Sequence, residues 1–558
     1  MKHSLFQSVT AGLVLVIASV SVHAQSLHSE FMQAVDERRN DSELLARAVE
    51  NWDNRALRLW GVMGNEACAA IRPYLNATED VVSAALEGLA NCRDTESYAV
   101  IAELARNGES YGVRSSALES LGFISTEVNR DDHVALVAGV LNSEKSDNEK
   151  ASALYGLMQA ITYSGLSPSD LSELDLEQVL SLAGQPGKLG FEAGYLLIRL
   201  QGLGATLRAE AVAEQITPDL PVGQAYLLAR VLGGLGQEAV APLLELSSER
   251  ASNDPREQRV AVSAVRALGT MTDPISRTFL MSLLLDAAPE FQQLALAALI
   301  AREDTDVIAQ ERIWNFVEDE NPWLAATALE GLVRLGDARA RDIAATWLAE
   351  GSFYKAFRAI AMLAGSDEGR AMLQDYLDKA RDLVRARLVQ GTLDPAATPP
   401  APVRPTVPYV EAASSDGNLV TLKTNRGDIT IEMFEGAPYS GHAFTTLANE
   451  GAMDGMIWHR VIPGFVAQFG QIDDMRQFDH GTIREEWGAL SHMPGTVGVA
   501  TSGPDTGSSQ VFINLEHNRH LDGRYTVFGR VVAGIDVVYS MQEGDAIIEA
   551  IGPGAVNE

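Results

Sequence analysis

The sequence is short of positive charge, of cysteine and of long hydrophobic runs. Its 558 residues contain 43 lysines and arginines against 75 aspartates and glutamates, giving a net charge of −32 that is spread along the chain. This excess of negative charge argues against nucleic acid or an anionic membrane surface as a partner, because both attract basic proteins. At this length we expect more than one domain, since a single hydrophobic core rarely exceeds about 300 residues.

Cysteine is nearly absent, and neither Cys68 nor Cys92 stands at a spacing typical of metal sites. In an oxidising compartment the two thiols permit one disulfide, and two buried free thiols are the alternative. No group of residues in 28–393 suggests catalysis, and His133 stands apart from other candidate residues, as a surface residue of a helical array usually does. We expect neither a metal nor a cofactor.

The only long apolar run is at the N-terminus, where residues 1–24 have the features of a signal peptide. A short basic start precedes Ala11–Val22, a run that is too short for a membrane span of about 20 residues. Small or apolar residues before Gln25 predict cleavage at that point, and an uncleaved anchor is the alternative. No later segment is apolar enough to span a membrane, so we expect an exported protein, periplasmic in a bacterium with two membranes.

Residues 28–393 contain a weak internal repeat with the periodicity of amphipathic helices. The leucines Leu86, Leu118 and Leu154 stand in similar phrases 32 and 36 residues apart. Steps of 31 to 33 residues separate a second series, Val265, Leu296, Leu329 and Ile360. The period and phrasing resemble HEAT-like repeats, in which stacked helix pairs form a superhelical solenoid. An irregular α-α superhelix of another class is the alternative.

The functional interpretation of such an array is that its concave face binds other proteins, and a purely structural scaffold is the alternative.

A Pro-rich linker is expected to follow at 394–418, because six prolines within 394–408 exclude helix interior and central strand. This change of composition predicts a domain boundary before residue 419.

From residue 419 onward, apolar residues alternate with a period of two. A hairpin is predicted for 419–434 around a turn at 425–428, and a short helix for 440–449. Further strands are predicted at 496–500, 511–515 and 526–532. Short strands with two helices within 419–558 predict a closed antiparallel β-barrel.

Three phrases in this region resemble cyclophilin-type peptidyl-prolyl isomerases. They are Trp458–Phe465, the stretch from Gly503 to Ile513, and Leu521–Gly529, which occur in the order and at the spacing of the family. The resemblance covers about 419–552. It implies a cyclophilin-like barrel that acts on proline-containing polypeptides.

The resemblance also implies roles for individual residues. The catalytic set would be Arg460, Phe465 and Gln468. The substrate-binding set would be Val466, Ala500, Thr501, Ser502, Gln510, Phe512, His520, Leu521 and Tyr525.

These residue types suit the chemistry of prolyl isomerisation. Rotation about an X–Pro bond crosses a barrier of roughly 18–20 kcal/mol because amide resonance is lost, yet no bond is made or broken. A dry apolar pocket can hold the proline ring, and a guanidinium can stabilise the twisted imide. The rival hypothesis is a scaffold that binds proline-containing segments with little turnover.

Two departures from the family pattern concern the rim of the groove. His520 stands where the family often has tryptophan, which predicts weak cyclosporin binding. The segment 468–476 replaces the family's usual glycine-rich loop, which changes the groove on that side.

Overall fold

The computed structural model describes residues 27–394, 418–470, 482–501 and 506–553, apart from short gaps within these ranges. The chain divides into two compact units: one contains the helices up to Asp175, and the other begins at Leu176 and includes the described C-terminal domain. The predicted signal peptide, most of the predicted linker and Ser502 lie outside the described residues, as does the side chain of His520.

The first unit is built from helices. Their bounds are α2 Ser42–Asn51, α3 Arg55–Gly61, α4 Asn65–Ile71, η1 Arg72–Asn76, α5 Glu79–Cys92, η2 Thr95–Ser97, α6 Tyr98–Asn107, α7 Tyr111–Ile124, α8 Arg130–Leu141, α9 Asp147–Tyr163 and η3 Pro168–Leu171.

Helices continue in the second unit as far as residue 393. Their bounds are α10 Leu176–Ala183, α11 Lys188–Gly202, α12 Ala209–Glu214, α13 Val222–Gly233, η4 Gly236–Ala239, α14 Val240–Leu246, α15 Pro255–Thr270, α16 Pro274–Asp286, α17 Pro289–Ala301, α18 Thr305–Ile308, α19 Glu311–Val317, α20 Pro322–Arg334, α21 Ala338–Glu350, α22 Phe353–Ala364, α23 Asp367–Lys379 and α24 Leu383–Leu393.

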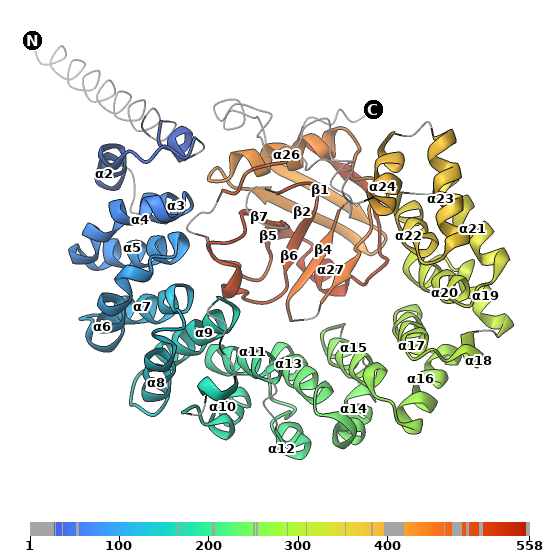
Figure 1. The fold of residues 1–558 in the computed structure, drawn as a ribbon, viewed down its shortest axis with the longest axis horizontal. Helices are drawn as coiled ribbons and strands as arrows, with labels where there is room; N and C mark the ends of the chain where they lie inside the picture. Colours follow the sequence, from blue (N-terminus) through green and yellow to red (C-terminus); the bar gives the residue numbers. More distant parts are fainter. Residues whose placement is uncertain are drawn as a thin grey trace, which may run out of the picture. The chain divides into compact units, whose positions relative to one another are not determined.

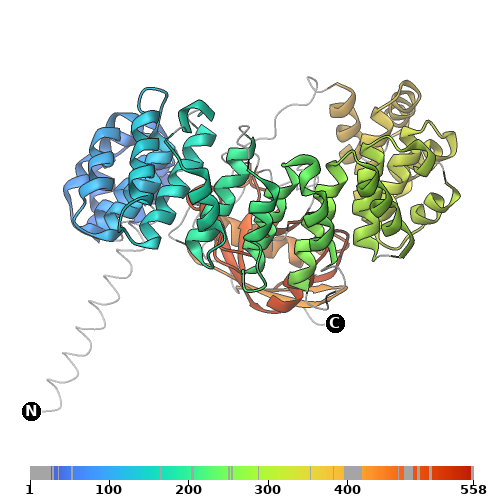
Figure 2. The ribbon, with the colours of Figure 1, turned by 90° about the horizontal axis from the view of Figure 1, so that it is seen from below.

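The repeated phrases of the sequence fall on helices that pack in series. In the first unit α5, α7 and α9 contact one another in turn, and in the second unit α13, α15, α17, α20 and α22 do the same. Figure 2 shows α13 to α17 as neighbouring helices in green. Gly156 permits close approach, because a β-carbon there would collide with the carbonyl oxygen of Leu118. The repeat therefore corresponds to stacked helices, as predicted.

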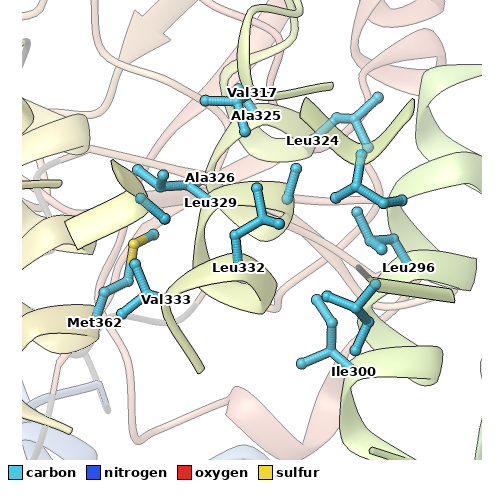
Figure 3. Packing of buried hydrophobic residues seen from close by; sticks show 14 of the residues in the cluster. Leu296, Ile300, Val317, Leu324, Ala325, Ala326, Leu329, Leu332, Val333 and Met362 are labelled. Carbon is cyan, nitrogen blue, oxygen red and sulfur yellow. The ribbon is translucent and has the colours of Figure 1, made fainter. Parts of the chain in front are cut away.

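A continuous apolar core lies between the helices of the second unit (Figure 3). Leu296 on α17, Leu329 on α20 and Ile360 on α22, which mark the repeat, are all buried in it. Helix α20 begins sharply because the side chain of Asn321 accepts hydrogen bonds from the backbone N–H groups of Trp323 and Leu324. Such a cap satisfies donors that an uncapped helix end would leave unpaired.

Two features of the first unit resolve questions left by the sequence. Cys68 on α4 and Cys92 at the end of α5 form a disulfide, with their Cα atoms 5.8 Å apart. The surface position expected for His133 was wrong: the side chain is fully buried, and its Nδ1 lies 2.9 Å from Oγ of Ser125. Burial lowers the pKa of His133 to about 4.

In the described part of the chain, no helix combines the length and the apolar character that a membrane crossing needs.

The C-terminal domain is one curled antiparallel sheet of eight strands in the order β3-β4-β6-β5-β7-β2-β1-β8 (Figure 1). The strands are β1 Leu419–Thr424, β2 Gly427–Met433, β3 Arg460–Val461, β4 Val466–Phe469, β5 Thr496–Val499, β6 Val511–Asn514, β7 Val527–Ala533 and β8 Ile547–Ile551. The two helices are α26 Pro438–Asn449 and α27 Ile535–Ser540, and η9 Arg519–Leu521 is a single 3₁₀ turn.

The sheet differs in one respect from the closed barrel expected. Strand pairing does not run between β3 and β8 in the described residues, so the sheet is a curled half-barrel. An isolated bridge between Ile457 and Ala546 joins the segments that lead into these two strands. The inner face of the sheet buries the domain core, where Phe444 of α26 packs 5.2 Å from Phe528 of β7 between ring centroids.

Candidate active site

The short strands β3 and β4 place the predicted catalytic residues side by side. Arg460 and Gln468 are directly opposite in the antiparallel register. Arg460 Nη1 donates a hydrogen bond of 3.1 Å to Oε1 of Gln468, and Nε2 of Gln468 donates one of 3.0 Å to Oε1 of Gln510. Since a guanidinium has five N–H donors, the bond to Gln468 fixes its orientation and leaves further donors to face a substrate.

The guanidinium also lies over an aromatic ring. Its Cζ is 5.4 Å from the ring centroid of Phe465, within the range of a cation–π contact. Loss of water around the group lowers the pKa of Arg460 below its usual value, and the neighbouring Tyr195 and Tyr525 oppose that shift. Because an arginine starts from a pKa above 12, the group stays charged.

Five of the predicted substrate residues and the predicted catalytic residue Phe465 form one apolar cluster that is separate from the domain core. Its buried members are Val466, Phe512 and Leu521, and the partly buried residues packed against them are Phe465, Ala500 and Tyr525. The ring of Tyr525 meets that of Phe512 edge-on, with centroids 6.0 Å apart. An apolar cluster with a buried centre and partly exposed edges suits a proline ring.

The remaining predicted residues border this cluster. Gln510 precedes β6, and its carbonyl oxygen accepts a 2.9 Å hydrogen bond from the N–H of Ala500. Thr501 follows Ala500, and its hydroxyl donates to the buried carboxylate of Glu485 at 3.3 Å. The structure thus brings together the described members of both predicted sets.

A glycine in β5 makes room for the central aromatic ring. A β-carbon at Gly498 would lie 2.5 Å from Cζ of Phe512 and 3.0 Å from its two Cε atoms. The position of Phe512 across the sheet is fixed by the pairing of Gly498 with Phe512 in adjacent strands. The ring therefore occupies the space that any other residue at 498 would need.

A buried polar network that the sequence reasoning missed supports the cluster from behind. His492 is fully buried and stacks on Phe512, with ring centroids 5.6 Å apart. Its Nε2 lies 3.2 Å from the carbonyl oxygen of Tyr525, and its Nδ1 lies 3.2 Å from Nδ2 of Asn514. These contacts fit a neutral imidazole that donates to the carbonyl and accepts from the amide. Burial lowers the pKa of His492 to about 4, which keeps it neutral.

The network continues to the turn that carries Phe465. Asn518 Nδ2 donates hydrogen bonds to Oδ1 of Asn514 at 2.8 Å and to the carbonyl oxygen of Phe465 at 2.7 Å. Both asparagines are fully buried. The signal in the sequence was Asn514, a polar residue at the end of the apolar strand β6. A single sequence does not show which hydrogen-bond partners such a residue will have.

Comparison with known proteins agrees with this geometry. The family model described as "Cyclophilin type peptidyl-prolyl cis-trans isomerase/CLD" matches residues 419–550. A peptidyl-prolyl cis-trans isomerase of Helicobacter pylori strain J99 is 39% identical over 142 residues, which are 24% of this chain and 84% of that protein. The chain belongs to the cyclophilin-type peptidyl-prolyl isomerase family.

Two further relatives give the same result for the cyclophilin domain. Peptidyl-prolyl cis-trans isomerase B of Bacillus subtilis is 39% identical over 132 residues, 22% of this chain and 87% of the relative. Isomerase ppi1 of Schizosaccharomyces pombe is 40% identical over 129 residues, 22% of this chain and 83% of the relative. All three matches are confined to about a quarter of this chain, so the likeness leaves the helical array aside.

The cyclophilin site can catalyse rotation without covalent chemistry. The apolar cluster offers a proline ring a surface shielded from water, and the guanidinium of Arg460, oriented by Gln468, lies over the ring of Phe465 in that cluster. Donation to the proline nitrogen, or to the adjacent carbonyl, favours the twisted state over either planar form. No titrating acid or base is required.

Proposed function

We propose that this cyclophilin isomerises Xaa-Pro bonds in exported proteins, with its helical array acting as a HEAT-like platform that binds clients or partner proteins. One observation carries the catalytic part of the proposal: Arg460, oriented by Gln468, stands over the ring of Phe465 beside the apolar cluster. A scaffold that only bound proline would need the apolar cluster alone. Catalysis also needs a donor fixed in place to stabilise the twisted imide, and the guanidinium of Arg460 is such a donor.

Two observations support export. The N-terminal sequence has the features of a signal peptide, and Cys68 is bonded to Cys92. Disulfides persist in oxidising compartments such as the bacterial periplasm and are rare in the cytosol. We expect the mature protein to begin at Gln25, and mass spectrometry of its N-terminus would check this. A mature protein that begins at Met1 would contradict export by this route.

Two features of the array support partner binding: its length and the internal repeat of its helices. Stacked helical repeats present extended surfaces, and those surfaces commonly bind proteins. The test compares the full mature chain with a variant that lacks residues 25–393. The three relatives consist mostly of the cyclophilin region, with 83–87% of their length matched, so this domain is expected to fold alone.

We expect the shortened variant to turn over small uncharged Xaa-Pro peptides at nearly the same rate as the full chain. It should lose most of the acceleration seen with an unfolded exported protein whose refolding is limited by proline isomerisation. An equal acceleration of refolding by the two forms would contradict the platform.

A further inference from the structure

A cavity with two arginines in its lining lies next to the catalytic strand and is lined largely by the helical array. Its volume is about 290 Å³. Tyr226 and Arg230 come from α13, Ser263 and Arg266 come from α15, and Ile462 is the lining residue from the cyclophilin domain. All of these belong to the second compact unit. We call this space the array cavity.

One tight turn separates the array cavity from the proline cluster. It runs from Ile462 to Phe465, and the N–H of Phe465 donates to the carbonyl oxygen of Ile462 at 3.0 Å. Ile462 lines the array cavity and Phe465 packs on the proline cluster. Gly464 has a φ of 74°, and a β-carbon there would lie 3.1 Å from Cδ1 of Tyr226. The turn therefore packs closely on α13.

Charged contacts hold α15 against the same part of the domain. Arg266 Nη2 pairs with Glu543, at 3.1 Å and 3.2 Å from the two carboxylate oxygens. Oε1 of Glu543 also accepts a 3.3 Å hydrogen bond from the N–H of Val461, the neighbour of Arg460. Arg259, which is buried, donates to the carbonyl oxygen of Tyr539 at 2.8 Å. A single carboxylate thus links the array to the catalytic strand.

Arginines gather around the array cavity although the chain as a whole is strongly acidic. The chain carries a net charge of −32, whereas Arg230 and Arg266 line the array cavity and Arg460 lies two residues from Ile462. On the acidic side, Glu543 is engaged by Arg266. Glu290 also interacts with Arg266 and Glu543, and loss of water around its carboxyl group raises its pKa to about 7. Arg230 is exposed at the cavity and can meet an incoming anion.

Building on the isomerase function above, we propose that the array cavity is a substrate subsite that takes a carboxylate side chain of the client, close in sequence to the isomerised proline. The two sites are close, because Ile462 lines one and Phe465, three positions later, packs on the other. The arginine fork accepts a carboxylate with two parallel N–H donors. The preferred substrates would then be acidic segments around proline.

The test uses the full mature chain and three peptides that carry Glu, Gln or Lys two residues from the same proline, placed on either side in turn. We expect kcat/KM for the Glu peptide to exceed that for the Gln peptide about threefold to fivefold, the size typical of one partly exposed ion pair. The Lys peptide should be the poorest substrate. The preference should shrink in 0.5 M salt, where exposed charges are screened.

Arg230→Gln is the decisive variant, because Arg230 is exposed and stands outside the catalytic set. It should abolish the preference for Glu while leaving turnover of the Gln peptide unchanged. Arg230→Lys, which keeps the charge, should restore most of the preference. A Glu-to-Gln ratio near one in the wild type would overturn the subsite, and so would a ratio that Arg230→Gln does not alter.

Calorimetric binding of the same peptides separates this proposal from the isomerase function. If the wild type binds the Glu peptide more tightly than the Gln peptide but turns over neither, the subsite stands and the catalytic proposal fails. If both peptides are turned over and bound equally, the catalytic proposal stands and the subsite fails.

Discussion

Replacing Gly498 by alanine tests whether the position of the Phe512 ring sets the catalytic rate. The new β-carbon would lie 2.5 Å from Cζ of Phe512, about 1 Å closer than ordinary contact allows. The ring cannot move away freely, because His492 stacks on one side and Tyr525 meets it edge-on. Overpacking of this kind costs about 1–3 kcal/mol.

The catalytic effect should exceed the effect on stability. A displacement of about 1 Å at a substrate-positioning residue can lower a rate by up to about 100-fold. We expect Gly498→Ala to reduce kcat/KM for an Xaa-Pro peptide at least tenfold, measured by a protease-coupled assay, while urea unfolding shows a smaller loss. Activity within twofold of the wild type would refute the reasoning that the ring is held in place.

Gly441→Ala in α26 is the matched control. A β-carbon at Gly441 would lie 3.4 Å from Cβ of Met433, which is ordinary contact. Alanine is favoured over glycine in helices by about 1 kcal/mol. This variant should therefore keep full activity and equal or slightly exceed the wild type in stability.

Three further predictions concern stability and the polar network. Burial lowers the pKa values of His133 and His492 to about 4, so both side chains are neutral in the native state and gain a proton on unfolding below pH 6.5. The free energy of unfolding should therefore fall by about 2 kcal/mol per histidine between pH 7 and pH 5. Identical urea midpoints at the two pH values would contradict this. Reduction of the disulfide, which joins cysteines 24 residues apart, should destabilise the first unit by about 3 kcal/mol, visible as a lower urea midpoint in dithiothreitol, and an unchanged midpoint would count against it. Asn518→Ala removes the donor to the Phe465 carbonyl and should lower kcat several-fold more than it raises KM. Asn425→Ala, at the turn between β1 and β2 and outside this network, should not, and equal effects of the two variants would show that the network is only structural.

Much of the site could be predicted from the sequence because its residues stand in short contiguous phrases. Arg460, Phe465 and Gln468 lie within nine residues, and an antiparallel turn between β3 and β4 brings them together. Phe512 joins them because β6 pairs with β4, which follows once the family is recognised, and Leu521 of η9 packs in the same cluster. The repeat of the array was visible for a similar reason, since each marker recurs on a buried helix.

The rest depends on pairings that local pattern does not contain. His492 and Asn514 meet only because β5 and β6 are adjacent, and neither residue stands in a recognisable motif. The bond between Arg259 and Tyr539 joins residues 280 positions apart. The unpaired gap between β3 and β8 was likewise invisible, because a period of two indicates strands but not whether a sheet closes.

The central claim, that the oriented guanidinium of Arg460 lowers the barrier to X–Pro rotation, is tested most directly by comparing the full mature chain with its Arg460→Ala variant. The protease-coupled assay should give a kcat/KM at least 100-fold lower for the variant, while calorimetry shows the proline peptide bound with an affinity within a few-fold of the wild type, because the apolar cluster is intact. Equal turnover by the two proteins would contradict the account.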